Sequence, residues 1–184
     1  MKFIVEHLEP ELFEWCLIEY KHISKIVGKN DLIFTNVKKG KNKLIKYGKV
    51  YSESVSKLNL RNACILDPSA GKTLSKKDNF DYIILGGILG DYPPKKRTKK
   101  ELSSKLKFPA RNLGRHQFST DNAAYVALQL LKGKKLSDLK FQSGIEVRLN
   151  KVESVELPFR YVVINKKPLV NPSLVRHLKN RKEF

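Results

Sequence analysis

The sequence predicts an α/β domain with a largely parallel β-sheet. Segments with the composition of strands alternate along the chain with segments of helical periodicity, which is typical of βαβ units. The run 80–85 is almost continuously apolar, as expected of a strand that is covered on both faces. The 184 residues fit a single domain, 1–184, in which the lysine-rich segment 38–62 is a candidate insertion.

The first half of the chain predicts four strands and one long helix. The helix is expected to open at Pro10, where the missing N–H costs nothing, and to end at Gly28. The lysine-rich stretch 38–49 is expected to form a loop and a short helix. The strands are expected at 2–8, 31–37, 63–66 and 80–85.

The second half predicts one well-marked helix, which Ser119 or Thr120 would cap and which ends at Gly133. Thr98 is a further candidate cap for a helix that follows it. The remaining predicted elements are strands at 145–149 and 159–164 and a last helix from Pro172 to about Arg181.

The chain is strongly basic, because 37 lysines and arginines against 18 acids give a formal charge of +19. The surplus is concentrated in three runs, 38–49, 95–107 and 166–182, whereas residues 1–20 carry five glutamates and one lysine. A basic surface attracts polyanions by neutralising phosphates, so contact with RNA is expected. The alternative is a solvated lysine-rich face like those of heat-adapted proteins, although these usually balance lysine with glutamate.

Several functional classes are disfavoured. No apolar run approaches the roughly 20 residues needed to cross a bilayer, and no apolar signal core is present, so a cytoplasmic protein without membrane contact is expected. Cys16 and Cys64 match no zinc or redox motif and are interpreted as core thiols, and no metal site is expected. The GKT string at 71–73 fails the P-loop pattern, because Leu66 stands where the first glycine is needed.

Three loops, 66–68, 86–91 and 113–120, are the candidates for a binding site. Ligands of open parallel sheets bind at the carboxyl ends of the strands, and glycines let the backbone approach a ligand closely. For any one loop alone, the alternative is a tight strand exit without a ligand. The four histidines and Ser119 match no pattern of hydrolases or metalloenzymes.

A set of short strings in a fixed order spans nearly the whole chain. These are FIVEH at 3–7, EW at 14–15, LDP at 66–68, FDY at 80–82, GGILGD at 86–91, PP at 93–94, RT at 97–98, LG at 113–114, Gln117, STD at 119–121 and LPFRY at 157–161. Together they resemble the Sfm1-like branch of the SPOUT methyltransferases.

The resemblance implies a SPOUT-type fold, with helices on both faces of a mostly parallel sheet and a deep trefoil knot near the carboxyl end. It also implies S-adenosylmethionine as the cofactor. This compound carries no phosphate, so backbone groups and short polar side chains suit it better than a phosphate-binding group of lysines. The residues assigned to the cofactor are Leu66, Asp67, Pro68, Gly86, Gly87, Ile88, Gly90, Leu113, Gly114, Gln117, Phe118 and Thr120.

The resemblance further implies methylation of an arginine in a ribosomal or other translation-associated protein. A guanidinium is protonated in ordinary surroundings, so a carboxylate must orient it and accept a proton during transfer. Glu6 and Asp91 are predicted for this role, because each lies at an expected strand end facing one crevice. The alternatives are an ion pair with a lysine for Glu6 and a turn cap for Asp91. His7 and Arg97 are the candidate substrate contacts, with structural roles as their alternatives.

Two other functions stay open at this point. Lys96 stands where the family carries an acid, and the added lysines suit a phosphate-rich target, which favours an RNA methyltransferase acting on rRNA or tRNA. A non-catalytic RNA-binding SPOUT module would keep the basic surface without the chemistry. The expected partner is a ribosomal protein or the ribosome, with RNA at the lysine-rich surface. A monomer is expected, with a dimer as the alternative.

Overall fold

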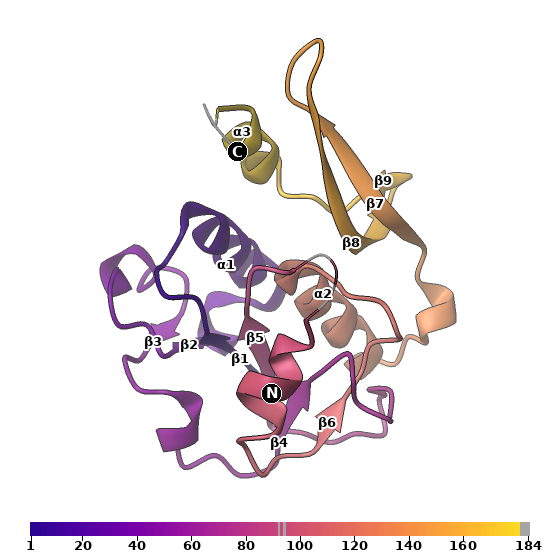
Figure 1. Ribbon diagram of the computed structural model, residues 1–184. Coiled ribbons are helices and arrows are strands. Elements are labelled where there is room, and N and C mark those ends of the chain that lie inside the picture. Colours follow the sequence, from indigo (N-terminus) through magenta and orange to yellow (C-terminus); the bar gives the residue numbers. More distant parts are fainter. Residues whose placement is uncertain (92, 94, 181–184) are drawn as a thin grey trace.

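The computed structural model describes residues 1–91, 93 and 95–180, and its largest part is a six-stranded sheet (Figure 1). The strand order is β3-β2-β1-β5-β4-β6, and every neighbouring pair is parallel. The prediction of a mostly parallel sheet is therefore confirmed. The strands are β1 (Lys2–His7), β2 (Leu32–Thr35), β3 (Lys49–Val50), β4 (Ala63–Leu66), β5 (Tyr82–Gly87) and β6 (Ala110–Arg111).

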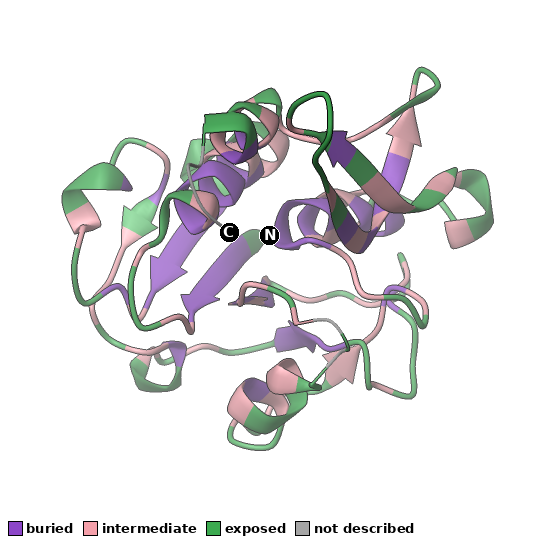
Figure 2. Ribbon diagram, turned by 45° about the horizontal axis from the view of Figure 1, so that its top comes forward, coloured by how far each residue is buried: buried purple, intermediate pink, exposed green. Residues whose placement is uncertain are grey.

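The central strands β1 and β5 explain the apolar runs in the sequence. Phe3 and Val5 belong to the hydrophobic core on one face of the sheet, and Ile4 belongs to the core on the other face. β5 follows the same alternation, with Ile84 beside Ile4 in the register. Figure 2 shows the inner strands as buried. Strands covered on both faces have no solvent-facing positions, which is why their sequence does not alternate between apolar and polar residues.

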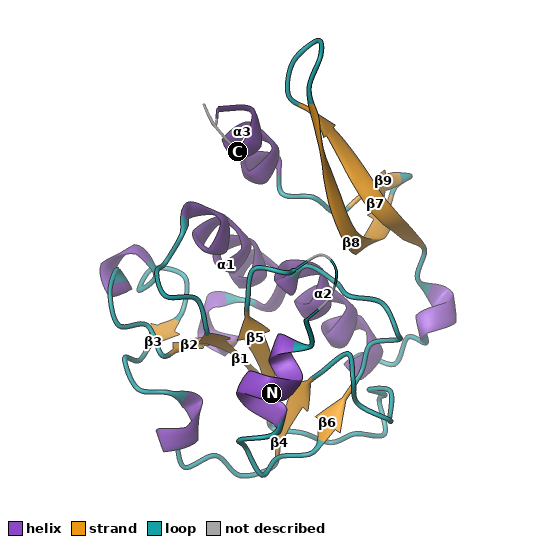
Figure 3. Ribbon diagram, viewed as in Figure 1, coloured by secondary structure: helices purple, strands orange, loops and turns teal. Residues whose placement is uncertain are grey.

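Helices cover both faces of the sheet, as the family resemblance implied, but they differ in size (Figure 3). The helices α1 and α2 pack on the face of Phe3 and Val5. The opposite face is covered by short helices, through Val55 of η3 and Leu102 of η4, a π-helix. None of the described helices is long and apolar enough to cross a membrane. The helices are α1 (Glu14–Val27), α2 (Thr120–Leu131), α3 (Pro172–Asn180), η1 (Lys29–Asp31), η2 (Lys41–Lys43), η3 (Val55–Lys57), η4 (Lys99–Ser103) and η5 (Leu136–Asp138).

A β-hairpin arm projects from the body of the molecule (Figure 1). It contains β7 (Phe141–Arg148) and β8 (Ser154–Ile164), and β9 (Lys167–Pro168) pairs with the end of β8. These strands are antiparallel. A separate core joins the arm to α3 and to Ile18 of α1. The predicted strands 145–149 and 159–164 lie within this hairpin, but they are too short, because only one side of most of the hairpin is buried and its apolar pattern is correspondingly sparse.

Some predicted boundaries are wrong by a few residues. The first helix begins at Glu14 and not at Pro10, because the preceding segment is tied to other loops: Glu9 accepts a hydrogen bond from Leu89 N at 2.8 Å. The second strand covers Leu32–Thr35 only.

Cys16 and Cys64 are buried, as expected of core thiols. The predicted end of the last helix at Arg181, the lysine at 182 and Pro94 of the family string lie outside the described residues.

Candidate functional site

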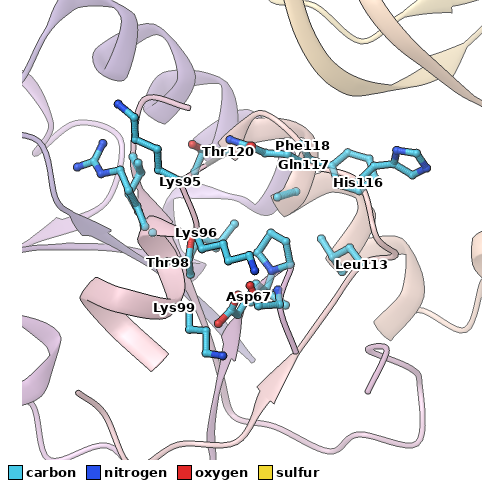
Figure 4. Close-up of a pocket in the computed structure, with 18 of the residues that line it drawn as sticks. Asp67, Lys95, Lys96, Thr98, Lys99, Leu113, His116, Gln117, Phe118 and Thr120 are labelled. Carbon is cyan, nitrogen blue, oxygen red and sulfur yellow. Dashed lines mark hydrogen bonds between the residues drawn. The ribbon is translucent and has the colours of Figure 1, made fainter. Parts of the chain in front are cut away.

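A cavity of about 480 Å³ lies at the carboxyl ends of β4, β5 and β6 (Figure 4). Its walls come from 66–69, 85–91 and 113–118, and the loop 95–99 and the start of α2 complete it. The volume lies in the range of pockets that enclose small molecules. The structure thus brings the three predicted loops together, because the carboxyl ends of parallel strands meet at one edge of a sheet.

The residues predicted for the cofactor line this cavity except for Gly87 and Gly90. Both of these glycines serve close packing instead. A Cβ added at Gly87 would collide with the Tyr20 hydroxyl and lie 3.0 Å from Glu6 O. A Cβ at Gly90 would lie 2.6 Å from Cζ of Phe159 and 2.7 Å from Nε2 of Gln117. Gly90 therefore lets the loop after β5 lie directly against the arm.

Asp91 and Glu6 do not face the same crevice, so that expectation was wrong. Asp91 lines the cavity, and its Oδ1 lies 3.1 Å from Nζ of Lys95. Glu6 does not line the cavity, and its side chain lies on the face of Ile4, because side chains alternate along a strand. Its buried carboxylate accepts hydrogen bonds from the Thr35 and Ser54 hydroxyls and from the backbone N–H at 55. Glu6 thus joins the candidate insertion to the sheet.

The two predicted substrate contacts also have structural partners. His7 is buried outside the cavity lining, with Nδ1 2.9 Å from the Tyr20 hydroxyl oxygen, and burial lowers the pKa of its imidazole. Arg97 does line the cavity, but its guanidinium forms ion pairs with Glu9 at 2.7 Å and with Glu101 at 2.8 Å. Arg97 therefore ties the loop 95–99 to the segment that follows β1, and a substrate contact from it stays a prediction.

The cavity combines an apolar wall with a cationic rim. The apolar wall consists of Leu66, Leu85, Leu113, Phe118 and Ala123, and the cationic side chains are Lys95, Lys96, Arg97, Lys99 and Arg115. Asp67 is buried at the base, where it accepts hydrogen bonds from Ser69 N at 2.7 Å and from the Ser103 hydroxyl at 2.6 Å. In the described part of the chain, no group of three or more potential metal ligands occurs. Such a lining suits a flat apolar ring joined to a polar or anionic end.

A buried acidic cluster behind the cavity was missed by the sequence analysis. Glu19 of α1 accepts hydrogen bonds from Trp15 Nε1 at 2.9 Å and from the backbone N–H of Thr120, a cavity residue, at 3.3 Å. Asp121 lies close by, with Oδ2 2.6 Å from Nδ1 of His22. Burial, and then the charge of Asp121, raises the pKa of Glu19 to about 8. The one available signal was a glutamate in the apolar stripe of the predicted helix, between Cys16 and Ile23.

Glu19 is expected to make the protein less stable as the pH rises. Because the pKa of Glu19 is about 8 in the folded protein and 4.5 in the unfolded chain, the folded state holds an extra proton between these values. This extra proton stabilises the folded state fully below the pKa that Glu19 has in the unfolded chain. The stabilisation is lost as the pH rises through the pKa that Glu19 has in the folded protein. The Glu19→Gln variant cannot ionise, so its Tm should fall less than that of the wild type between about pH 7 and pH 9.

Thermal unfolding followed by circular dichroism measures this difference. The chosen range lies above the titration of His7, whose lowered pKa affects stability only under more acidic conditions. If Tm fell by the same amount with rising pH in the wild type and in Glu19→Gln, the role given to Glu19 would be contradicted.

Comparison with known proteins gives consistent matches. Residues 2–183 match the family model described as Protein arginine N-methyltransferase SFM1-like. The chain is similar to Protein arginine N-methyltransferase SFM1 of Saccharomyces cerevisiae, with 36% identity over 187 residues that cover 89% of this chain and 86% of the relative.

Solved structures agree with this match. The yeast arginine methyltransferase SFM1 complexed with SAM has a TM-score of 0.87 and 33% identity, and covers 97% of this chain and 89% of its own. The complex of the same enzyme with SAH has the same TM-score at 32% identity, and it covers 97% of this chain and 94% of its own. Trm10 from Thermococcus kodakaraensis has a TM-score of 0.56 at 16% identity, over 75% of this chain and 96% of its own, which is a likeness of fold.

Proposed function

The chain belongs to the SFM1-like family of protein arginine N-methyltransferases, and we propose that it methylates an arginine side chain of a protein. It is an S-adenosylmethionine-dependent methyltransferase with the SPOUT-type α/β fold that the family resemblance implied. The observation that carries the arginine proposal is the cavity at the carboxyl ends of β4, β5 and β6, where residues predicted for the cofactor lie beside the carboxylate of Asp91.

The cavity lining fits the cofactor. The apolar wall with Leu113 and Phe118 suits the adenine ring. β4 pairs with β5 only as far as Ile84, so on that side the backbone at Gly86 faces the cavity and not a neighbouring strand. Its polar groups are therefore available to the ribose. When bound, the cofactor supplies a methyl group on a positively charged sulfur.

Asp91 is the carboxylate that we assign to the substrate guanidinium. Its partner Lys95 is 68% exposed, so solvent weakens the ion pair. The arginine of a substrate can take the place of Lys95, because its guanidinium offers two parallel N–H donors to the carboxylate and a lysine cannot. In this position Asp91 orients the attacking nitrogen and accepts the proton that the nitrogen loses as it is methylated.

We also infer that the chain forms the trefoil knot that the family resemblance implied. After β5 the chain passes through η4 to β6 at the edge of the sheet, and it then returns past the cavity so that α2 packs over the sheet centre. On this return, Gln117 O accepts a hydrogen bond from Arg160 N at 2.8 Å. A return of this kind past an already formed loop is the path that a knot requires, and it is rare among folds.

The proposed substrate is an arginine of a ribosomal or other translation-associated protein in the cytoplasm, methylated by a monomer. The charge of +19 supports a target surrounded by RNA. The exposed side chains of Lys95, Lys96, Lys99 and Arg115 at the cavity add positive charge next to the point where the arginine would enter. RNA beside the arginine would therefore be attracted to this surface.

The test is to incubate the protein with methyl-labelled S-adenosylmethionine and ribosomes, and then to digest separately with protease and nuclease. We expect protease to release the label, and acid hydrolysis to recover it as methylarginine. A heat-inactivated sample is the control. Label released by nuclease alone would instead establish an RNA methyltransferase, and RNA binding without label would indicate a non-catalytic module.

A further inference from the structure

Lys96 lines the cavity in a backbone conformation that lysine rarely adopts. Its φ is +55°, in the left-handed region that favours glycine. Lys166, another lysine with positive φ, occupies the short turn between β8 and β9, where such a conformation is common. Lys96 belongs to no hairpin turn of the described residues, and it directly precedes the helical turns that begin at Arg97. Residues held in sparsely populated conformations cluster at ligand sites, so Lys96 is a candidate for binding.

The cationic neighbours of Lys96 are already paired with acids. Lys95 pairs with Asp91, and Arg97 pairs with Glu9 and Glu101. Within the residues that the structure describes, the Lys96 ammonium has neither a hydrogen bond nor an ion pair. Figure 4 shows its side chain reaching across the cavity toward the loop of Asp67, while those of Lys95 and Lys99 extend away. Over its own cofactor pocket the protein therefore holds an exposed ammonium that has no hydrogen-bond or ion-pair partner among the described residues.

The two sides of the cavity suit the two ends of the cofactor. Figure 4 shows Leu113 and Phe118 on one side and the loop 95–99 on the other. An adenine ring against the apolar side leaves the amino-acid end of the molecule facing the loop. A carboxylate that leaves water needs a charged or hydrogen-bonding partner, and an ammonium is a strong one.

We infer that Lys96 binds the carboxylate of the methionine portion of the cofactor. This inference rests on the cofactor assigned to the cavity and is independent of the methyl acceptor. Lys96 would thus select ligands that carry the amino-acid end over those that consist of the nucleoside alone. S-Adenosylhomocysteine has this carboxylate, and 5′-methylthioadenosine lacks it, so the two compounds separate the contribution of Lys96 from that of the adenosine pocket.

Isothermal calorimetry with both compounds tests the inference. Lys96→Gly is the informative variant, because glycine adopts the observed φ without strain and so preserves the loop. We expect it to lower the affinity for S-adenosylhomocysteine about tenfold, as for loss of one charged hydrogen bond, and to leave that for 5′-methylthioadenosine within about twofold. Lys96→Arg should retain most of the affinity. Lys25→Ala, at an exposed lysine of α1 that does not line the cavity, is the matched control and should change neither.

The outcomes separate this inference from the proposed function. If Lys96→Gly lost affinity equally for both compounds, the loop would be disturbed. If its affinity for S-adenosylhomocysteine were unchanged, the carboxylate would be bound elsewhere. Either result overturns the role of Lys96. Wild-type protein that binds neither compound would instead overturn the cofactor assignment. Normal binding without methyl transfer to arginine would affect only the proposed substrate.

Discussion

Replacing Asp91 by asparagine is expected to lower the rate of arginine methylation by about 100-fold or more, the usual contribution of a positioned acid or base. An amide keeps the shape of the side chain, but it cannot accept a proton or hold a guanidinium through two charged bonds. The affinity for S-adenosylhomocysteine should stay within about threefold, because the adenosine pocket does not depend on this carboxylate.

Single-turnover methylation of ribosomes, the proposed source of the substrate, together with calorimetry, measures both quantities. Glu146→Gln is the matched control, since Glu146 is an exposed carboxylate on the arm, away from the cavity. A rate within a few-fold of wild type in Asp91→Asn would remove Asp91 from the mechanism.

Replacing Glu6 by alanine is expected to destabilise the fold by about 3 kcal/mol, because three hydrogen-bond donors lose their acceptor inside the protein. For a chain of this size, that loss lowers Tm by about 6 to 12 °C. Glu6→Gln should cost about 1 kcal/mol or less, since the amide oxygen can accept from Thr35 and Val55 while the Ser54 hydroxyl turns to accept from its NH₂ group.

The pair of Glu6 variants also decides between a structural and a catalytic role. If Glu6 holds the insertion to the sheet, the folded Glu6→Gln protein should retain most of its methyl-transfer rate. A normal Tm with a large loss of turnover would restore Glu6 as a catalytic residue. Glu53→Gln is the control, because Glu53 is an exposed glutamate of the same segment whose carboxylate accepts a hydrogen bond from the neighbouring Ser52.

Much of the fold could be predicted because it depends on local patterns. The almost continuous apolar run at 80–85 marks a strand buried on both faces, and β4 was predicted at its observed bounds, Ala63–Leu66. The hairpin arm was only partly predicted, because its exposed positions dilute the apolar signal. The start of α1 was misplaced because Glu9 is held by a loop that follows β5, far along the chain.

By itself, the sequence determined the parallel sheet and the loops that form the cavity, because strand patterning and loop position follow from the order of residues, and its resemblance to a known family implied the cofactor. Only the tertiary structure decided which side chains face that cavity. Alternation along β1 places Glu6 and Val5 on opposite faces, but nothing local states that Glu6 meets Ser54 and Val55 and not the cavity. The contact of Glu19 with Thr120 and the position of Lys96 at the cavity likewise arise from segments far apart in the chain, whose meeting depends on how the whole molecule packs.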